Sequence, residues 1–228
     1  GAVAAGDGKG MTGNMTTIRH HLTDAVLGDY VAGDLPEAFG LVVAVHLSMC
    51  DDCRARAMTL DALGGAVLEV GDTAEMGVGA LAAVLGRLDA APARVALPSR
   101  ARGVLPAPLV DYVGGDLDAV KWKSVGKGVK QAILPTDRLA SARLLRIPGG
   151  VAVPDHGHRG MEMTLVLQGA FADGTGRFGP GDVEIAGDEL EHTPVAEAGP
   201  DCICLAATDA PLRFRGLIPR LAQPFFRI

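Results

Sequence analysis

Apolar residues follow a helical spacing in the first part of the chain, from Ile18 to about Leu88. Ala, Leu and Val dominate there, and charged residues recur at intervals that leave apolar faces with a period near 3.6 residues. Glycine and proline mark where the helices begin and end. The pattern predicts four helices, at Thr23–Ala32 (ending at Gly33), Pro36–Met49, Asp51 or Asp52 to about Glu69 (with a weak point at Gly64 and Gly65) and Thr73–Leu88.

The composition changes between Ala90 and Pro108, where the sequence reads APARVALPSRARGVLPAP after Ala90. A stretch so rich in Ala, Pro and Arg sustains neither helix nor strand, so we interpret residues 90–108 as a linker. The boundary separates a helical domain at 15–89 from a second domain at 109–228. Residues 1–14 lack the apolar stretch of a secretory signal and are interpreted as a disordered leader or a tag.

Short apolar runs replace the helical pattern after the linker. Turns such as PGG at 148–150 and GPGD at 179–182 separate them, and this spacing is typical of an antiparallel β sandwich or barrel. The expected strands contain residues 129–134, 142–147, 163–167, 183–185 and 202–206. The predicted fold class is therefore α+β in two domains, a bundle of about four helices followed by a β barrel.

Composition limits which kinds of partner are expected and in which cellular compartment the protein is expected. A net charge of −6 and a pI near 5.5 provide no basic face for phosphate backbones, so direct nucleic-acid binding is not expected. The longest apolar run, Leu41–Leu47, contains His46 and is far shorter than the roughly 20 residues that span a bilayer, so no membrane association is expected. Four cysteines in two close pairs suit a reducing cytoplasm better than a secreted disulfide framework.

The segment HLSMCDDC at 46–53 has the spacing of a metal site. His46 and Cys50 lie four residues apart on one helical face, and Cys53 follows across the junction to the next helix. Nitrogen and sulfur donors suit tetrahedral zinc, and a closed four-ligand site would be structural. The fourth ligand is His21 or its neighbour His20. The alternative is that the cysteines are small core residues or a redox pair.

A second group of ligand-type residues lies in the expected barrel. His156 and His158 are two apart on a strand and share a face, and Glu162 opens the neighbouring strand. This spacing, from Gly150 to Gly169, matches the first motif of the cupin family, and His192 is the remaining histidine for a fourth ligand. The set would hold zinc, iron or manganese. The alternative is a group of surface histidines in a glycine-rich turn.

Two cysteines remain, Cys202 and Cys204, two apart on an expected strand, where they would face the same way. We interpret them as core residues, with a redox-responsive pair as the alternative.

The order of the two motif regions resembles the ChrR family of zinc anti-sigma factors. The resemblance covers nearly the whole chain from Met15 and includes TTIRHHLTDAVLGDYVAGDLPEAF, HLSMCDDCRARA and AVPDHGHRGMEMTLVLQGAF. It implies His21, His46, Cys50 and Cys53 as the N-terminal zinc ligands, with His20 as a rival for the first.

The resemblance also implies a function. The N-terminal helices would bind an extracytoplasmic-function sigma factor in the cytoplasm, with their apolar faces against it, and inhibit it. The cupin domain would help to release it under oxidative stress, singlet oxygen in particular, without acting as an enzyme. The alternative is a metal-dependent cupin enzyme, of the dioxygenase or isomerase type, with an accessory helical domain.

Overall fold

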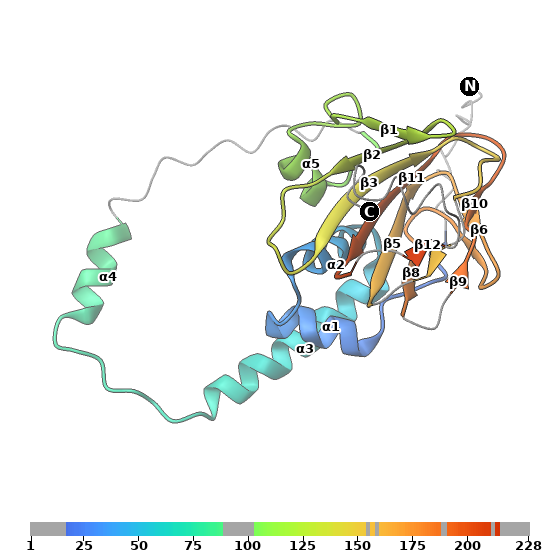
Figure 1. Ribbon diagram of the computed structural model, residues 1–228. Coiled ribbons are helices and arrows are strands. Elements are labelled where there is room, and N and C mark those ends of the chain that lie inside the picture. The colour runs from blue at the N-terminus through green and yellow to red at the C-terminus, as the bar shows by residue number, and fades with distance from the viewer. Residues whose placement is uncertain are drawn as a thin grey trace, which may run out of the picture.

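Helices precede strands in the computed structural model of the protein (Figure 1). The structure describes residues 17–88, 103–153, 156–157, 160–187, 191–210 and 213–214. The predicted leader and most of the predicted linker lie outside these residues. In the described part, five helices are followed by antiparallel strands, which confirms the predicted α+β class with its β barrel.

Three of the four predicted helices form at the expected places. Helix α1 (Asp24–Ala32) begins at Thr23, whose hydroxyl accepts a hydrogen bond from the N–H of Val26, and ends at Gly33 in the left-handed conformation. Helices α2 (Glu37–Met49) and α3 (Asp51–Glu69) follow. The expected weak point in α3 does not interrupt it, because a glycine inside a helix costs only about 1 kcal/mol.

The fourth helix is shorter than predicted. Helix α4 spans Ala80–Leu88 instead of beginning at Thr73, because Gly79 has a φ of 87° and starts the first turn by accepting the N–H of Ala83. A short helix, α5 (Ala107–Val113), was not predicted; it follows Pro106 at the end of the expected linker.

The largest sheet has six antiparallel strands and contains all five predicted runs. Their order is β1 (Lys123–Gly126), β2 (Val129–Ile133), β3 (Ser141–Ile147), β11 (Cys202–Thr208), β5 (Glu162–Gln168) and β8 (Val183–Ala186). Only β1 was not expected, and its mostly exposed residues explain why it lacks an apolar pattern.

Two small sheets complete the barrel in the described part of the chain. One joins β10 (Val195–Ala196), β6 (Phe171–Ala172) and β7 (Arg177–Phe178), and the other joins β12 (Arg213–Phe214), β4 (His156–Gly157) and β9 (Glu191–His192). Inside the barrel, Phe171 and Phe178 pack against Cys202 and Cys204 from the large sheet.

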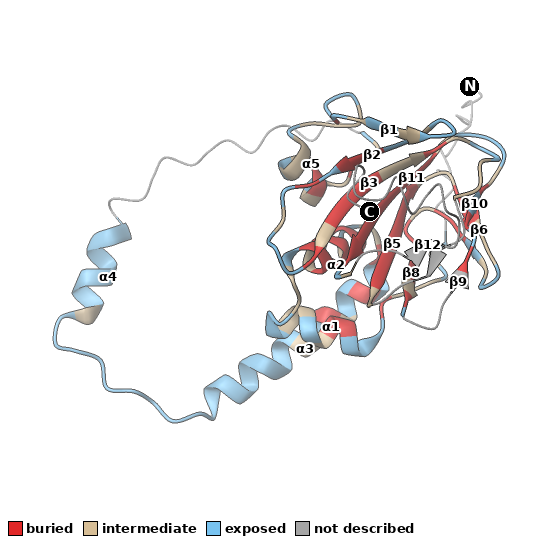
Figure 2. Cartoon of the chain, viewed as in Figure 1, coloured by how far each residue is buried: buried red, intermediate tan, exposed pale blue. Residues whose placement is uncertain are grey.

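Helix α2 covers the other face of the large sheet. Val42, Val43 and Val45 are fully buried there, in one core with Ile203 and Leu205 of β11. Strand β11 is therefore buried on both faces, and the red residues of Figure 2 run continuously from α2 into the sheet. The helices and the barrel share this core, and the boundary predicted at 90–108 stays a prediction.

No described helix is by itself long and apolar enough to cross a membrane; α1 and α2 reach that length only as a pair bent by 113°.

Candidate metal centre

A compact group of ligand-type side chains forms where α1, α2 and α3 meet. It combines the segment before α1, the last turn of α2 and the first turn of α3. One ligand atom from each residue lies within 4.8 Å of the others. The members of this group, called the N-terminal cluster below, are His21, His46, Cys50 and Cys53.

The α2–α3 junction places three of these side chains. Cys50 ends α2, with its N–H on the carbonyl of His46 at 2.8 Å, and it also caps α3. Its Sγ accepts the N–H of Cys53 at 3.4 Å. The first turn of a helix carries partial positive charge, which favours the thiolate form that binds metals.

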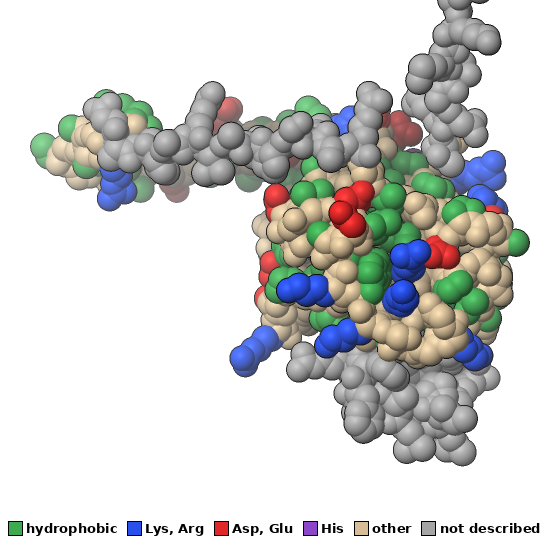
Figure 3. All heavy atoms as spheres, turned by 90° about the horizontal axis from the view of Figure 1, so that it is seen from above, with side chains coloured by type: hydrophobic (Ala, Val, Ile, Leu, Met, Phe, Trp, Pro, Cys, Tyr) green, Lys and Arg blue, Asp and Glu red, His purple; other side chains and the backbone are tan. Residues whose placement is uncertain are grey.

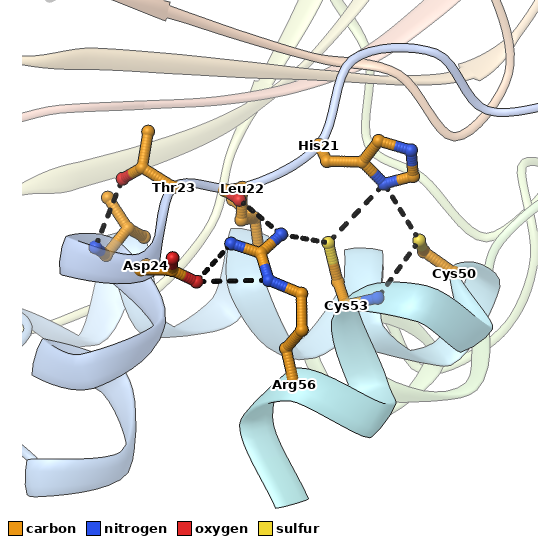
Figure 4. A network of polar contacts seen from close by, with 8 residues as sticks. His21, Leu22, Thr23, Asp24, Cys50, Cys53 and Arg56 are labelled. Atoms are coloured by element: carbon orange, nitrogen blue, oxygen red, sulfur yellow. Dashed lines mark hydrogen bonds and ion pairs between the residues drawn. The ribbon is translucent and has the colours of Figure 1, made fainter. Parts of the chain in front are cut away.

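The distances between His21 and the two cysteines fit tetrahedral coordination of a metal ion. His21 Nδ1 lies 3.3 Å from Cys50 Sγ and 3.5 Å from Cys53 Sγ (Figure 4). Zinc with usual Zn–N and Zn–S bond lengths separates neighbouring N and S ligands by roughly 3.6 Å. A single ring nitrogen offers one lone pair, so it cannot accept good hydrogen bonds from both thiols at once. A shared cation explains both contacts.

His46 gives the strongest sign of a cation site. Its ring is fully buried, and its Nδ1 donates to the carbonyl oxygen of Gly181 at 2.9 Å. Its Nε2 must then carry the lone pair, and this buried atom has no hydrogen-bond partner among the described residues. Burial lowers the pKa of His46 to about 4, which keeps the ring neutral, as a metal ligand requires.

Arg56 connects the cluster to the chain before α1. Its guanidinium donates to the carbonyl of Leu22 and pairs with Asp24, and Nη1 lies 3.8 Å from Cys53 Sγ (Figure 4). Burial raises the pKa of the Cys53 thiol, and the nearby Arg56 charge opposes that effect. A divalent cation would oppose it far more strongly, since coordination deprotonates a thiol.

His20 has a different environment. Its ring packs on Phe178, with centroids 4.3 Å apart, and its Nδ1 lies 3.5 Å from Asp182 Oδ1. The structure thus brings His21, and not His20, to the cysteines.

The second predicted ligand set is described only in part. His158 lies outside the described residues, and only the backbone of His156 is described, opposite His192 in the β4–β9 pairing. Glu162 opens β5 as predicted and is buried, with Thr164 donating to its carboxylate at 3.0 Å. The four residues stay a predicted metal site.

His192 also lies between two carboxylates that we did not predict. Its Nδ1 is 2.6 Å from Asp173 Oδ2 and 3.3 Å from Glu184 Oε1, and the three could hold a cation between them. We call them the barrel cluster. A carboxylate on one ring nitrogen commonly orients a histidine whose other nitrogen binds a metal.

The charges in the barrel cluster support one another. Although burial lowers the pKa of His192, its hydrogen bonds to Glu184 and Asp173 raise it to about 9. Burial alone would raise the pKa of Asp173, but hydrogen bonds from Thr175 and His192 bring it to about 2. Burial raises the pKa of Glu184. The ring and the Asp173 carboxylate therefore form a buried ion pair when no metal is bound.

A signal for Glu184 was present in the sequence. It is a charged residue inside the apolar run Val183–Ile185, and an acidic side chain buried in a strand needs a partner. Asp173 gave no such signal, because it lies in a loop of ordinary turn residues. Cys202 and Cys204 face the same way, as predicted, with their sulfur atoms 3.5 Å apart and both side chains buried.

Known proteins resemble the chain over nearly its full length. Residues 111–210 match the family described as the ChrR cupin-like domain. The chain is 63% identical over 212 residues, 93% of its length, to the whole of the anti-sigma-E factor ChrR of Cereibacter sphaeroides. It also superimposes, with a TM-score of 0.77 and 60% identity, on a crystal structure of Rhodobacter sphaeroides SigE in complex with the anti-sigma ChrR, covering 85% of this chain and 100% of that one.

Proposed function

Because this chain belongs to the ChrR family of anti-sigma factors, we propose that it binds a sigma factor of the extracytoplasmic-function class and keeps it from RNA polymerase. The relative of known structure is in complex with SigE, a sigma factor. We place the activity in the cytoplasm, where the polymerase is, and assign the chain no enzymatic reaction.

An exposed apolar surface carries this proposal. Every residue from 61 to 79 is exposed, and so is every residue of α4 except Ala80. Leu68 and Leu81 are 83% and 71% exposed. We call this surface the α3–α4 face; its large apolar residues are Leu63, Val67, Leu68, Val70, Met76, Val78, Leu81, Val84, Leu85 and Leu88.

The α3–α4 face extends away from the barrel. In Figure 1 the end of α3 and all of α4 project to the left of the barrel, and in the space-filling view green apolar side chains lie on the surface of α4 (Figure 3). A single soluble protein rarely exposes so many large apolar residues together, and such patches are typical of protein interfaces. An isolated helix as short as α4 is also marginal in water, so a partner would stabilise it.

The N-terminal cluster would support this binding surface. We propose that it holds zinc, since its two thiols and two imidazoles suit zinc better than they suit hard cations. The ion would fix α3 to α2 and to the segment before α1. In this arrangement the sheet covers α2. The sigma factor would therefore contact mainly the α3–α4 face, and the contact would not be spread evenly over the four predicted helices.

The barrel would provide the response. We propose that it binds a metal, zinc, iron or manganese, through His156, His158, Glu162 and His192, and that this part helps to release the sigma factor under oxidative stress such as singlet oxygen. Membership of the family supports this step. Substituting His156 and Glu162 should leave sigma-factor binding intact and abolish release by photochemically generated singlet oxygen. Loss of binding itself in that variant would contradict the division of roles.

Binding to purified Rhodobacter sphaeroides SigE tests the proposal. Isothermal titration should show a tight complex with the zinc-loaded chain and none, or a much weaker one, with the Cys50→Ala, Cys53→Ala variant. The matched control is Cys202→Ala, Cys204→Ala, which removes two buried thiols from the barrel and should bind normally. No binding by the unmodified chain would overturn the proposed partner. Equal binding by all three proteins would overturn the role of the N-terminal cluster.

A further inference from the structure

Asp182 lies on the barrel, in the turn before β8, but its carboxylate is bonded mainly to the N-terminal segment. The residue is buried, and Oδ1 accepts the N–H groups of Arg19 at 2.6 Å and His20 at 2.9 Å. Its other oxygen accepts the N–H of Gly179 at 2.8 Å, inside the turn. The carboxylate therefore fixes the backbone immediately before His21.

Two further hydrogen bonds join the same turn and the start of β8 to His46 of the N-terminal cluster and to the residue before His21. The N–H of Val183 donates to the carbonyl of His20 at 3.1 Å. The carbonyl of Gly181 accepts from Nδ1 of His46 at 2.9 Å. This second bond selects the tautomer of His46 that leaves Nε2 free for a metal. The turn thus positions two of the four ligands, His21 through its preceding residue and His46 through its ring.

The turn and the N-terminal segment are in close contact. Gly181 has a φ of 90°, and a Cβ at this position would lie 2.5 Å from Cδ1 of Ile18 and 3.8 Å from Cε of Met49. Only glycine allows both the backbone conformation and the approach of Ile18. The contact leaves little freedom for the cluster to move relative to the barrel.

From this geometry we propose that Asp182 is a positioning residue for the N-terminal metal centre, through which the barrel raises the affinity of that centre for its ion. The inference rests on the metal centre proposed above. Without the carboxylate, the N–H groups of Arg19 and His20 lose their acceptor, and the backbone that holds His21 gains freedom. Outer contacts of this kind typically change metal affinity by about 10- to 100-fold.

A purely structural role for Asp182 makes a different prediction. If the carboxylate only stabilised the fold, its removal would lower the stability of the metal-free chain, and metal affinity would change no more than that loss implies. A positioning role lowers the affinity for the ion beyond the loss of stability. It also changes the ligand geometry that a bound Co²⁺ ion reports in its visible absorption.

The experiment compares full-length Asp182→Ala and Asp182→Asn with Asp201→Asn as the control. Asp201 is also a barrel carboxylate, and it accepts a hydrogen bond from Arg146 at 2.6 Å within the barrel. Zinc affinity comes from competition with a chromophoric chelator, ligand geometry from Co²⁺ spectra, and metal-free stability from urea unfolding. Asp182→Asn keeps one acceptor oxygen, so it serves if the alanine variant fails to fold.

We expect Asp182→Ala to bind zinc about 10- to 100-fold more weakly, with altered Co²⁺ bands, and Asp182→Asn to show a smaller loss in the same direction. The control should keep the affinity of the unmodified chain. Unchanged affinity in both Asp182 variants, or a loss that matches their loss of metal-free stability, would overturn the inference. Failure of the unmodified chain to bind zinc would instead overturn the metal centre itself.

Discussion

Val43 in α2 and Val84 in α4 both belong to short apolar helices, but Val43 is fully buried and Val84 is 52% exposed. Helix α2 is apolar on nearly all sides and lies between the sheet and the neighbouring helices. Helix α4 has one apolar stripe at a spacing of three and four residues, and its other side is Ala, Gly and Arg. An all-round apolar helix is typical of a core, whereas a stripe needs one partner surface. Helix α2 therefore has its partner within the chain, whereas the stripe of α4 is exposed in the described part of the chain, and we propose that it binds the sigma factor.

The largest expected effect is on stability, from a truncation in α2. Phe39 is buried at 2% exposure, so Phe39→Ala should lower the free energy of unfolding by about 3–5 kcal/mol, because it leaves a cavity in the core that the helices share with the barrel. The matched truncation in α4, Leu85→Ala, should cost less than about 0.5 kcal/mol in the free protein. Urea unfolding of both variants measures the contrast. Similar losses would show that α4 is packed on this protein.

The second effect is on partner binding, from a charge placed in α4. Leu85→Asp should weaken SigE binding by about 2 kcal/mol, close to 30-fold, because a charge would be buried in the interface. Ala83→Asp puts the same charge on the opposite side of the helix and should change affinity little. Titration calorimetry on both variants, with circular dichroism to verify the fold, shows whether the apolar stripe of α4 or its opposite side contacts the partner. If Ala83→Asp is the more damaging variant, the stripe does not face the partner.

The smallest effect comes from Gly65 in α3, and Gly181 in the barrel turn provides a contrasting, more costly substitution. Gly65 lies in the exposed half of α3 with open space around it, so Gly65→Ala should stabilise this helix by about 0.5–1 kcal/mol. Gly181→Ala should destabilise the protein, because the new methyl group would meet Ile18. Helix content by circular dichroism and unfolding by urea measure the two changes. A loss of helix in Gly65→Ala would mean that this part of α3 is not helical in solution.

Local signals in the sequence were sufficient for much of the fold. The helical spacing of apolar residues, with Gly33 and Pro36 at helix ends, predicted three helices, and short apolar runs between turns rich in glycine and proline predicted five of the six strands in the large sheet. The spacing of His46, Cys50 and Cys53 predicted their cluster, because one helical face and one helix junction bring them together.

Long-range packing was not predictable in the same way. Nothing local to α2 shows that the sheet, and not a partner protein, covers it. Asp173, Glu184 and His192 come from separate parts of the barrel, so their contacts depend on the registers of strands that do not neighbour one another in sequence. The bond from His46 to Gly181 likewise joins residues 135 positions apart.

The central claim is that the apolar surface of α2 is covered within the chain, whereas that of α4 is covered by the sigma factor. Hydrogen exchange of the full chain, alone and with SigE, tests this claim. The account predicts that amides of α2 (Glu37–Met49) are protected in both samples. Amides at 61–70 and 80–88 should exchange rapidly in the free protein and become protected in the complex. Unchanged exchange in α4 on binding, or rapid exchange of α2 in the free chain, would contradict it.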